Sequence, residues 1–144
     1  MVVAMVSVAM AQDELEWIDP LQHGDWHLEG RVHEEKQYGR LPKEAEKKVR
    51  KQVWNLSRQT AGLYVKFMTD APEIQVKYSY RGPLAMFHMP ATGVSGFDLY
   101  RQTAQGDLRW VDCSKPKKAS GVIKLAAGDP VAKGKPSLFK IYLP

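Results

Sequence analysis

The residues that come nearest to a catalytic arrangement surround Ser95, in the run Gly93-Val94-Ser95-Gly96. In many hydrolases a nucleophilic serine occupies the pattern G-x-S-x-G, which exposes the hydroxyl on a sharp turn between a strand and a helix. Here the position of the second glycine is taken by Phe97, and the residues that follow alternate as in a strand. The pattern is therefore incomplete, and we do not expect Ser95 to act as a nucleophile.

The other reactive side chains are few and scattered. The chain has four histidines and one cysteine, and Cys113 has no histidine or second cysteine near it in the sequence. This spacing does not match a metal site, and a single cysteine excludes an internal disulfide. The sequence contains no dinucleotide fingerprint, phosphate-binding loop or H-E-x-x-H pattern. We expect no catalytic residue, no metal and no cofactor in this chain, and we expect Cys113 to be a partly buried thiol.

Polar and aromatic residues near Ser95 could bind a ligand instead. His88 could face a ligand or a partner domain, although a lone histidine near an apolar strand is more often structural. Asp98 could bind sugar hydroxyls, or its carboxylate could satisfy donors of the preceding turn. Aromatic faces pack well on sugar rings, and the candidates for such a platform are Tyr100, Trp26, Trp54 and Trp110. Packing in the core is the favoured interpretation of Trp54 and Trp110, because both lie inside expected strands.

Short strands must position these residues. Apolar and polar residues alternate in most segments, which is the pattern of a strand with one buried face. Turns rich in glycine and proline separate the segments, and helical composition is confined to residues 43–48. We expect strands at residues 26–32, 49–56, 63–67, 74–80, 97–103, 108–111, 122–125 and 137–143. The sequence thus predicts an all-β fold, an antiparallel β-sandwich or jelly roll of seven or eight short strands with at most one short helical turn.

Several connections have specific expected shapes. Residues 69–73 and 104–107 predict the loops of two hairpins, each between consecutive strands. Residues 90–96 contain one proline and two glycines, which predicts a shaped turn with positive φ or a close backbone approach. Gly30 indicates a bulge or a second close approach of two backbones.

Size and charge limit the classes of protein. A chain of 144 residues with 44% hydrophobic residues is long enough for one buried core and too short for two ordinary domains. The net charge of +5 invites a polyanion, but the lysines of the C-terminal third lie among Gly, Pro, Ala and Ser. A nucleic-acid site would prefer interleaved aromatics and arginines. We therefore expect a solvated basic face and no nucleic-acid partner.

The first eleven residues form an uncharged apolar run that is far too short to span a bilayer. The run ends in Ala9-Met10-Ala11, the small-x-small pattern that precedes signal-peptide cleavage, and polar residues follow it. We expect residues 1–11 to be the remnant of a signal peptide, residues 12–144 to form one domain, and the protein to be secreted or periplasmic with no membrane partner. The alternative is that the run forms an apolar N-terminal strand of the fold.

Several motifs occur in the order of one known family. Gly96-Phe97-Asp98-Leu99-Tyr100 matches the pattern G-x-D-L-Y. The other matching motifs are Leu28-Glu29-Gly30-Arg31, Arg40-Leu41-Pro42, Val53-Trp54-Asn55-Leu56-Ser57-Arg58 and Ala61-Gly62-Leu63. With these motifs, residues 15–144 resemble the N-terminal domain of secreted bacterial SGNH (GDSL-type) hydrolases. The resemblance implies a β-sandwich placed before an α/β hydrolase domain, whose substrates are typically esters and often acyl groups on carbohydrates.

The catalytic residues of that family have no counterpart in this chain. An SGNH site needs a serine in a Gly-Asp-Ser block, a glycine and an asparagine as oxyanion donors, and an Asp-x-x-His pair. The Gly-Asp pairs at residues 24–25, 106–107 and 128–129 are followed by Trp, Leu and Pro, and no histidine follows an aspartate by three residues. The resemblance therefore implies a chain with no esterase activity of its own, and it leaves open whether the whole protein is an enzyme. Residues 141–144 resemble the strand that continues into the hydrolase domain.

We expect the chain to be an accessory domain that docks on the catalytic domain of an SGNH esterase through residues 88–96. A rigid loop of proline and glycine on the rim of a sandwich is suited to packing against a neighbouring domain. The candidate docking or ligand-facing residues are His88, Pro90, Thr92, Ser95, Asp98 and Tyr100. The alternative is an independent carbohydrate-binding module, whose ligand would be a glycan.

Overall fold

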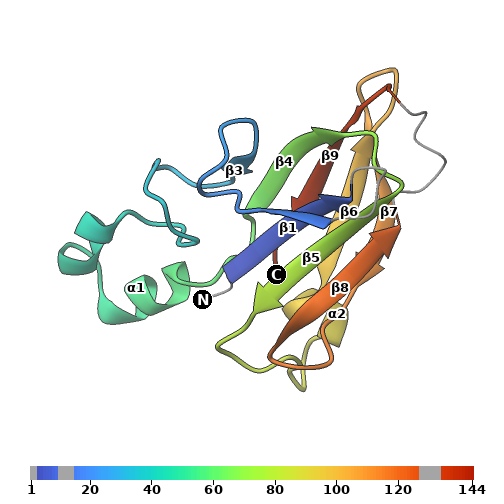
Figure 1. Ribbon diagram of the computed structural model, residues 1–144. Helices are drawn as coiled ribbons and strands as arrows, with labels where there is room; N and C mark the ends of the chain where they lie inside the picture. Colours follow the sequence, from blue (N-terminus) through green and yellow to red (C-terminus); the bar gives the residue numbers. More distant parts are fainter. Residues whose placement is uncertain (1–2, 10–14, 127–133) are drawn as a thin grey trace.

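The computed structural model describes residues 3–9, 15–126 and 134–144, which form two antiparallel sheets packed face to face (Figure 1). The four-stranded sheet has the order β2 (Leu15–Ile18), β1 (Val3–Ala9), β5 (Glu73–Ser79), β8 (Ser120–Ala126). The five-stranded sheet has the order β3 (His27–Glu29), β4 (Tyr64–Thr69), β9 (Ser137–Tyr142), β6 (Phe97–Gln102), β7 (Leu108–Ser114). The expected antiparallel β-sandwich is confirmed, with nine strands in the described part of the chain.

The core lies between the two sheets and follows the alternation of the strands. In β4 and β9 the inward side chains of Phe67 and Phe139 are fully buried, with 6.0 Å between their ring centroids. The Trp26 ring stacks on Phe67 at 4.3 Å. The four-stranded sheet contributes the buried residues Ile74, Val76, Tyr78 and Leu125. Burying one such side chain stabilises the fold by about 1.5–3 kcal/mol, so the two patterned faces drive the sheets together.

β1 occupies an inner position of the four-stranded sheet, between β2 and β5. It pairs with β5 from residue 3 to residue 8 and with β2 from residue 6 to residue 9. Residues 3–9 thus form a strand of the fold, which is the alternative that we gave to a signal peptide. The expected cleavage position after Ala11 lies outside the described residues, and cleavage stays a prediction.

The hairpin expected around residues 69–73 does not form, because β4 and β5 belong to different sheets. The connection crosses between the sheets: the Ala71 amide donates to Thr69 Oγ1 at 3.0 Å, and Pro72 has no amide hydrogen with which to continue a ladder. Alternation shows that a strand has one buried face but not which strand it pairs with, so the expected partner was wrong. The second expected hairpin, between β6 and β7, is confirmed.

Residues 49–56, expected as a strand, instead contribute to the helix α1 (Lys51–Ser57). β-branched residues in the segment favour a strand, but the helix brings together residues three and four positions apart. Arg58 lies over the Trp54 ring at 4.9 Å, and Ser57 Oγ donates to the Trp54 carbonyl at 2.7 Å. The strand prediction was wrong, and the helical content exceeds the single turn that we expected.

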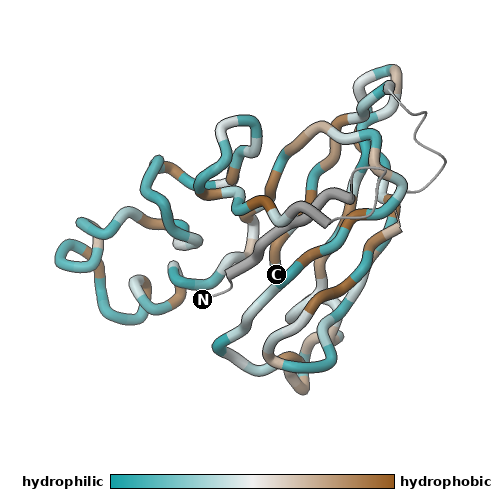
Figure 2. The backbone as a smooth tube through the Cα atoms, in the orientation of Figure 1, coloured by the Kyte–Doolittle hydropathy of each residue, from teal (hydrophilic) through white to brown (hydrophobic). Residues whose placement is uncertain are grey.

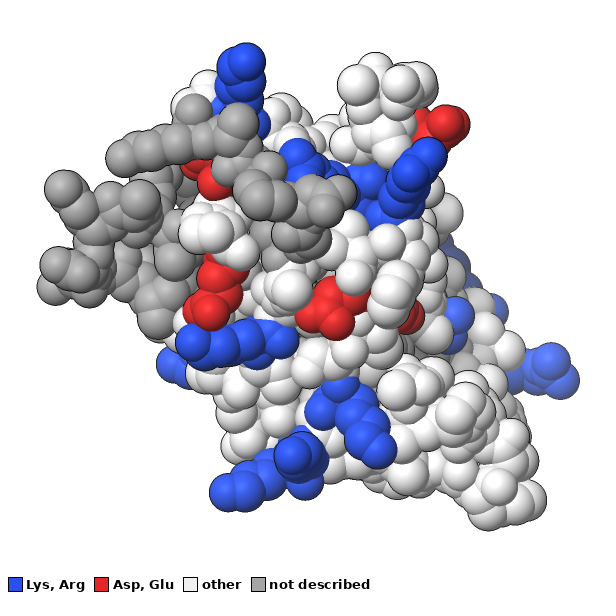
Figure 3. All heavy atoms as spheres, turned by 90° about the vertical axis from the view of Figure 1, so that its right-hand side faces the viewer, with Lys and Arg blue, Asp and Glu red and all other residues white. Residues whose placement is uncertain are grey.

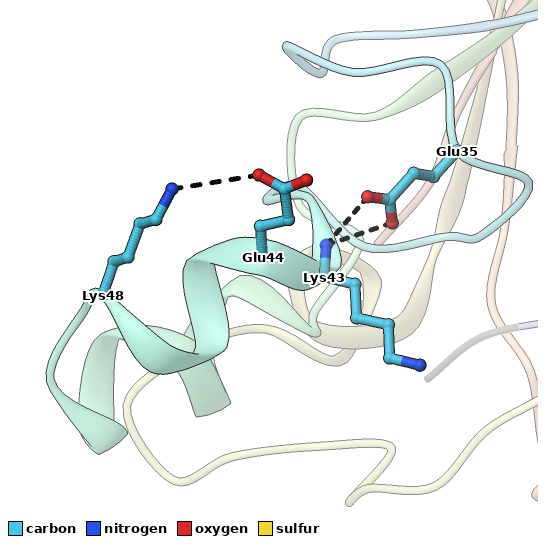
Figure 4. Close-up of polar contacts among 4 residues, drawn as sticks. All are labelled: Glu35, Lys43, Glu44 and Lys48. Atoms are coloured by element: carbon cyan, nitrogen blue, oxygen red, sulfur yellow. Dashed lines mark hydrogen bonds and ion pairs between the residues drawn. The ribbon is translucent and has the colours of Figure 1, made fainter.

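The segment before α1 forms a lobe beside the sandwich, which Figure 2 shows to be mostly hydrophilic. It contains the expected helical turn as the 3-10 helix η1 (Lys43–Lys47). The Glu35 carboxylate accepts hydrogen bonds from the Lys43 backbone amide at 3.0 and 3.1 Å, and Glu44 forms an exposed ion pair with Lys48 at 3.8 Å (Figure 4). The first contact satisfies an amide that a helix start leaves without a partner. The exposed pair adds only about 0.2–1 kcal/mol.

The lobe joins the sandwich where Gly30 meets the backbone of Gly62. Gly30 has φ +86°, and a Cβ at this position would lie 2.2 Å from the Gly62 carbonyl oxygen. Beside it, Arg31 Nη1 donates to the carbonyl oxygens of Glu35 and Gln37, both at 2.5 Å. The close backbone approach expected at Gly30 is confirmed, and only glycine permits it.

Candidate functional site

The connection from β5 to β6 ends in a one-turn helix, α2 (Ala91–Ser95), where we expected a shaped turn. The Pro90 carbonyl accepts hydrogen bonds from the amides of Gly93 at 2.9 Å and Val94 at 3.2 Å. Pro90 precedes the helix with φ −60°. The fixed φ of a proline suits a helix start, which the turn prediction overlooked. A Cβ on Gly96 would lie 2.3 Å from the Thr92 carbonyl oxygen, so the close approach expected in this stretch is confirmed at Gly96.

Ser95 holds this connection together from the inside. Its side chain is 1% exposed, and its hydroxyl lies 2.9 Å from the Leu84 carbonyl oxygen and 3.2 Å from that of Ala91. The Tyr80 hydroxyl donates to the Ser95 carbonyl at 2.6 Å, and burial raises the pKa of Tyr80. The hydroxyl of Ser95 therefore has a structural role and does not face the surface.

The loop before α2 presents apolar side chains to the solvent. We call this surface the apolar rim, and it consists of Met86, Phe87, His88, Met89 and Pro90, all of which are exposed. Phe87 is fully exposed and meets the His88 ring edge-on at 4.7 Å. Figure 2 shows hydrophobic residues at the tip of this loop. His88 is exposed on this rim together with Pro90, so its burial does not support the structural role that we favoured. Thr92, on α2, is exposed as well.

The last described residues lie at the end of the sandwich where α2 leads into β6. Tyr142 is paired with Asp98, the second residue of β6. The Leu143 amide donates to the Leu63 carbonyl at 2.9 Å, and the Thr60 hydroxyl donates to the Pro144 carbonyl. The chain therefore reaches Pro144 between the start of β6 and the connection from α1 to β4. Two exposed apolar side chains of α1, Val53 and Leu56, precede that connection.

The outer face of the five-stranded sheet holds the other two expected site residues, Asp98 and Tyr100. The Tyr100 ring meets Tyr142 edge-on at 5.4 Å, and Tyr142 lies 5.1 Å from Tyr64. Trp110 is the cross-strand partner of Tyr100, and cross-strand partners share a face. We call Tyr64, Tyr142, Tyr100 and Trp110 the aromatic face. It runs across β4, β9, β6 and β7 in order.

Trp110 is 58% exposed, so the interpretation that it packs in the core was wrong. The sequence shows an aromatic residue in a strand, but the burial of its face depends on the partner sheet. Trp54 is half-buried in α1, and Trp26 is buried in the core. Of the four aromatic residues proposed as a platform, only Tyr100 and Trp110 lie on one surface.

Charged groups brace one end of the aromatic face. The Tyr64 hydroxyl donates to the Glu29 carboxylate at 2.5 Å, which lowers the pKa of Glu29 and raises the pKa of Tyr64 to about 12. Lys66 lies 3.5 Å from the same carboxylate. Lys140 Nζ sits over the Tyr64 ring, 4.5 Å from its centroid. These contacts hold the Tyr64 ring in place.

At the other end, Asp98 faces Cys113 across the ladder between β6 and β7. Burial, with a smaller contribution from the hydrogen bond and charge of Asp98, raises the pKa of the Cys113 thiol to about 11. A thiol with so high a pKa is a poor nucleophile at neutral pH, because the thiolate is the reactive form. The partly buried thiol expected at Cys113 is confirmed.

A hollow of about 390 Å³ lies beside the edge strand β3. Its lining is mostly polar and includes His23, His27, Glu29, Arg31 and Glu34. Glu29 also contacts Tyr64, so the hollow adjoins the braced end of the aromatic face. In the part of the chain that the structure describes, no group of three or more His, Cys, Asp or Glu is arranged to hold a metal ion, and no helix is long and apolar enough to cross a membrane.

The basic side chains seen from the side of β7 and β8 do not form one continuous patch. Figure 3 shows them in several separate groups, with carboxylates between them. Across β5 and β8, the Glu73 carboxylate pairs with Lys124 at 3.1 Å. Opposite charges interleaved in this way weaken the field that a polyanion would feel.

Reasoning from the sequence found Asp98 and Tyr100 but missed Tyr64, Tyr142 and Phe87. In β4 and β9 the residues next to Tyr64 and Tyr142 are buried, so alternation places both tyrosines on the other face of the sheet. The sequence contains this signal. Nothing in the sequence shows that β4 pairs with β9, and that pairing brings the rings together. Exposure of Phe87 depends on the loop conformation and has no sequence signal.

Comparison with known proteins gives one family and one fold relative. Residues 15–144 match the family described as GxDLY, the N-terminus of SGNH-hydrolase-type esterases. The fold is similar to a crystal structure described as that of a GDSL-like lipase from Bacteroides ovatus, with a TM-score of 0.72 and 21% sequence identity. The similarity covers 83% of this chain and 35% of that protein, so the chain spans about a third of its length. No curated protein matches the chain. At this level of identity the solved structure supports the sandwich fold alone.

Proposed function

The chain belongs to the family of GxDLY domains, the N-terminus of SGNH-hydrolase-type esterases, and on this premise we propose that it is a non-catalytic accessory domain that docks on an esterase domain following it in the same polypeptide. The family match extends over residues 15–144. The solved relative is about three times longer than the part that this chain matches. Both observations support a second domain beyond the sandwich.

The observation that supports docking most strongly is the apolar rim, whose loop leads through α2 into the strand that pairs with Tyr142. Phe87 is fully exposed, and Met86 and Met89 beside it are exposed as well. Leaving a phenylalanine side chain in water forfeits about 1.5–3 kcal/mol of burial energy. Contiguous exposed apolar residues of this kind mark interaction sites. A domain that continues from Pro144 would meet this rim without a long linker, because α2 leads directly into the strand that pairs with Tyr142.

The rim is also held in a defined shape. Ser95 and Tyr80 anchor α2 through the hydrogen bonds to Leu84 and from Tyr80 to the Ser95 carbonyl. A preformed surface loses less conformational entropy on binding than a flexible loop. In the proposed role, α2 and its preceding loop form one wall beside the esterase cleft.

For the whole protein we propose an exported carboxylic ester hydrolase that acts on acyl groups of carbohydrates. The support for export is the apolar run that ends in Ala9-Met10-Ala11. Removal of residues 1–11 would also remove β1 and leave β2 and β5 without their shared neighbour. The location of the protein and its N-terminal sequence test this. Recovery from culture medium or periplasm with a start at Gln12 supports export with cleavage. Recovery from the cytoplasm with an intact start contradicts it.

Activity measurements test whether this domain is non-catalytic and a second domain carries the esterase activity. We expect the 144-residue chain not to hydrolyse p-nitrophenyl acetate above a heat-denatured control, and the complete product of its gene to hydrolyse it readily. The downstream coding sequence should contain a Gly-Asp-Ser block and an Asp-x-x-His pair. Turnover by the chain alone, or a downstream sequence without those blocks, would contradict the proposal.

A further inference from the structure

We propose that the aromatic face binds a neutral oligosaccharide, with Trp110, Tyr100 and Tyr142 packing on sugar rings and Asp98 and Lys140 hydrogen-bonding to hydroxyls. This deepens the proposed function, on which the choice of a carbohydrate as the ligand rests, because it gives the accessory domain a ligand site of its own. The site lies on the sheet face and is distinct from the apolar rim, so the two surfaces can be tested separately.

Trp110 is exposed on the outer face of the five-stranded sheet. More than half of its surface is in contact with solvent, on β7 beside a shift of register in the ladder with β6. Tryptophan is large and combines an apolar body with a hydrogen-bond donor, which suits a surface that is apolar on one side and wet on the other. Its neighbour Tyr100 stands directly opposite in the ladder. The two rings offer adjacent flat apolar surfaces at the edge of the sheet.

The aromatic residues follow one another across neighbouring strands. From Trp110 the row continues through Tyr100 and Tyr142, whose ring centroids are 5.4 Å apart. Neighbouring strands lie about 4.8 Å apart. Tyr142 lies two residues along β9 from Lys140, the cross-strand partner of Tyr100, so the three aromatic residues form a row that crosses three successive strands obliquely. A linear chain of sugar rings presents apolar C–H faces along its length, and this row is matched to such a chain rather than to a single small molecule.

Acidic and basic side chains lie beside the rings in equal number. Asp98 on β6 is paired with Tyr142 on β9, and Tyr100 on β6 is paired with Lys140 on β9. Each tyrosine therefore has a charged partner across the ladder: the Asp98 carboxylate is a hydrogen-bond acceptor, and the Lys140 ammonium group is a donor. Further along the face, Glu29 is matched by Lys66 at 3.5 Å. These two carboxylates and two ammonium groups offset one another, which favours a neutral ligand rich in hydroxyls over an anion or a cation.

The rings at the β4 end of the aromatic face are held in place by their neighbours. Tyr64 is held by Glu29 and covered by Lys140, and its ring packs against Tyr142. Tyr64 is therefore a positioning residue: it fixes Tyr142 rather than offering its own face. Rings that are ordered before binding lose little side-chain entropy when a ligand arrives.

The test uses the 144-residue chain and hexasaccharides of cellulose, xylan, mannan and chitin, followed by tryptophan fluorescence and calorimetric titration. We expect saturable binding of at least one hexasaccharide, and we expect Trp110→Ala to weaken it at least tenfold. Trp110 is exposed, so its removal should leave the unfolding temperature unchanged. The matched control is Trp17→Ala on β2, which removes an exposed tryptophan of the other sheet and should leave the affinity unchanged. A second variant, Tyr64→Phe, should weaken binding by a smaller factor and leave the stoichiometry unchanged.

Absence of saturable binding to all four hexasaccharides at millimolar concentration would overturn the inference, as would binding that Trp110→Ala does not change. Protection of residues 97–102 and 108–114 from hydrogen exchange by the esterase domain, without any glycan binding, would assign the face to a protein contact and also overturn it. The proposed function has its own test at residues 84–92. A failure of glycan binding with docking intact leaves the accessory role standing, and the reverse result leaves the glycan site standing.

Discussion

The side-chain hydroxyl of Ser95 lies 2.9 Å from the backbone carbonyl oxygen of Leu84, eleven residues earlier in the chain. This hydrogen bond closes the loop that bears the apolar rim and fastens it to α2. A residue that resembles a catalytic serine in the sequence is thus the residue that gives a docking surface its shape.

Replacing Ser95 with alanine should therefore loosen the rim. The change leaves the Leu84 carbonyl without this donor in a part-buried position, and such a loss costs about 1–3 kcal/mol. We expect a lower free energy of unfolding in urea and faster amide exchange at residues 84–90. Thr92→Ala, an exposed change on the same helix, should alter neither quantity; equal effects of the two variants would show that Ser95 has no special role.

Gly96 and Gly93 should respond in opposite ways to alanine. At Gly96 the added Cβ would lie 2.3 Å from the Thr92 carbonyl oxygen, so the backbone must shift, and overpacking of this kind costs about 1–3 kcal/mol. At Gly93 the nearest atoms are side-chain carbons at 3.7 and 3.8 Å, and alanine is favoured over glycine inside a helix by about 1 kcal/mol. Urea unfolding should show Gly96→Ala destabilised and Gly93→Ala unchanged or stabilised. The opposite order would contradict the backbone geometry described for α2.

Tyr64→Phe should raise the pKa of Glu29 toward its ordinary value. The Tyr64 hydroxyl is the largest cause of the lowered pKa, and Lys66 would continue to lower it. A carboxyl whose pKa is lowered by folding contributes stability at a pH above its unfolded pKa and loses it as the pH falls through the folded pKa. We therefore expect the variant to be less stable than the parent at neutral pH, with the difference shrinking in acid.

Carboxyl ¹³C NMR titration measures this pKa directly, and Tyr100→Phe is the matched control. It removes a hydroxyl from the same sheet face, and its effect on the Glu29 pKa should be negligible. A Glu29 pKa that does not move in Tyr64→Phe would show that the lysines, Lys66 and Lys140, account for the shift without the Tyr64 hydroxyl.

Phe87→Ser should weaken docking without affecting the fold. Phe87 is fully exposed, so its removal should not change the unfolding temperature of the chain. If Phe87 is an anchor of the interface, its loss should weaken the affinity for the separately produced esterase domain at least tenfold, or about 1.4 kcal/mol. Val32→Ser removes another highly exposed apolar side chain, away from the rim, and should leave the affinity unchanged.

The sandwich was predictable because its strands alternate. Segments such as Phe97–Gln102 and Ser137–Tyr142 have one buried face in sequence and in structure. Partners were not predictable: alternation in Tyr64–Thr69 and Glu73–Ser79 fits a hairpin equally well, yet the two strands lie in opposite sheets. The helix at Lys51–Ser57 was missed because its stabilising contacts, such as Arg58 on Trp54, are visible only once the helix is formed.

The site was predictable only where it coincided with the family motif. Asp98 and Tyr100 were identified from the motif itself, and both lie on the outer face of the sheet. Tyr142 belongs to the same surface through the pairing of β9 with β6, which no local pattern reveals. His88 and Pro90 do lie on an exposed rim, but its apolar character comes mainly from Phe87, which local sequence reasoning passes over.

Hydrogen exchange can measure whether the apolar rim docks on an esterase domain. Amides of residues 84–92 should be compared between the 144-residue chain and the complete product of its gene. We expect strong protection of these amides in the complete protein. We expect no comparable change in β7, residues 108–114, which carries Trp110 of the aromatic face. Identical exchange at residues 84–92 in the two proteins would contradict this docking.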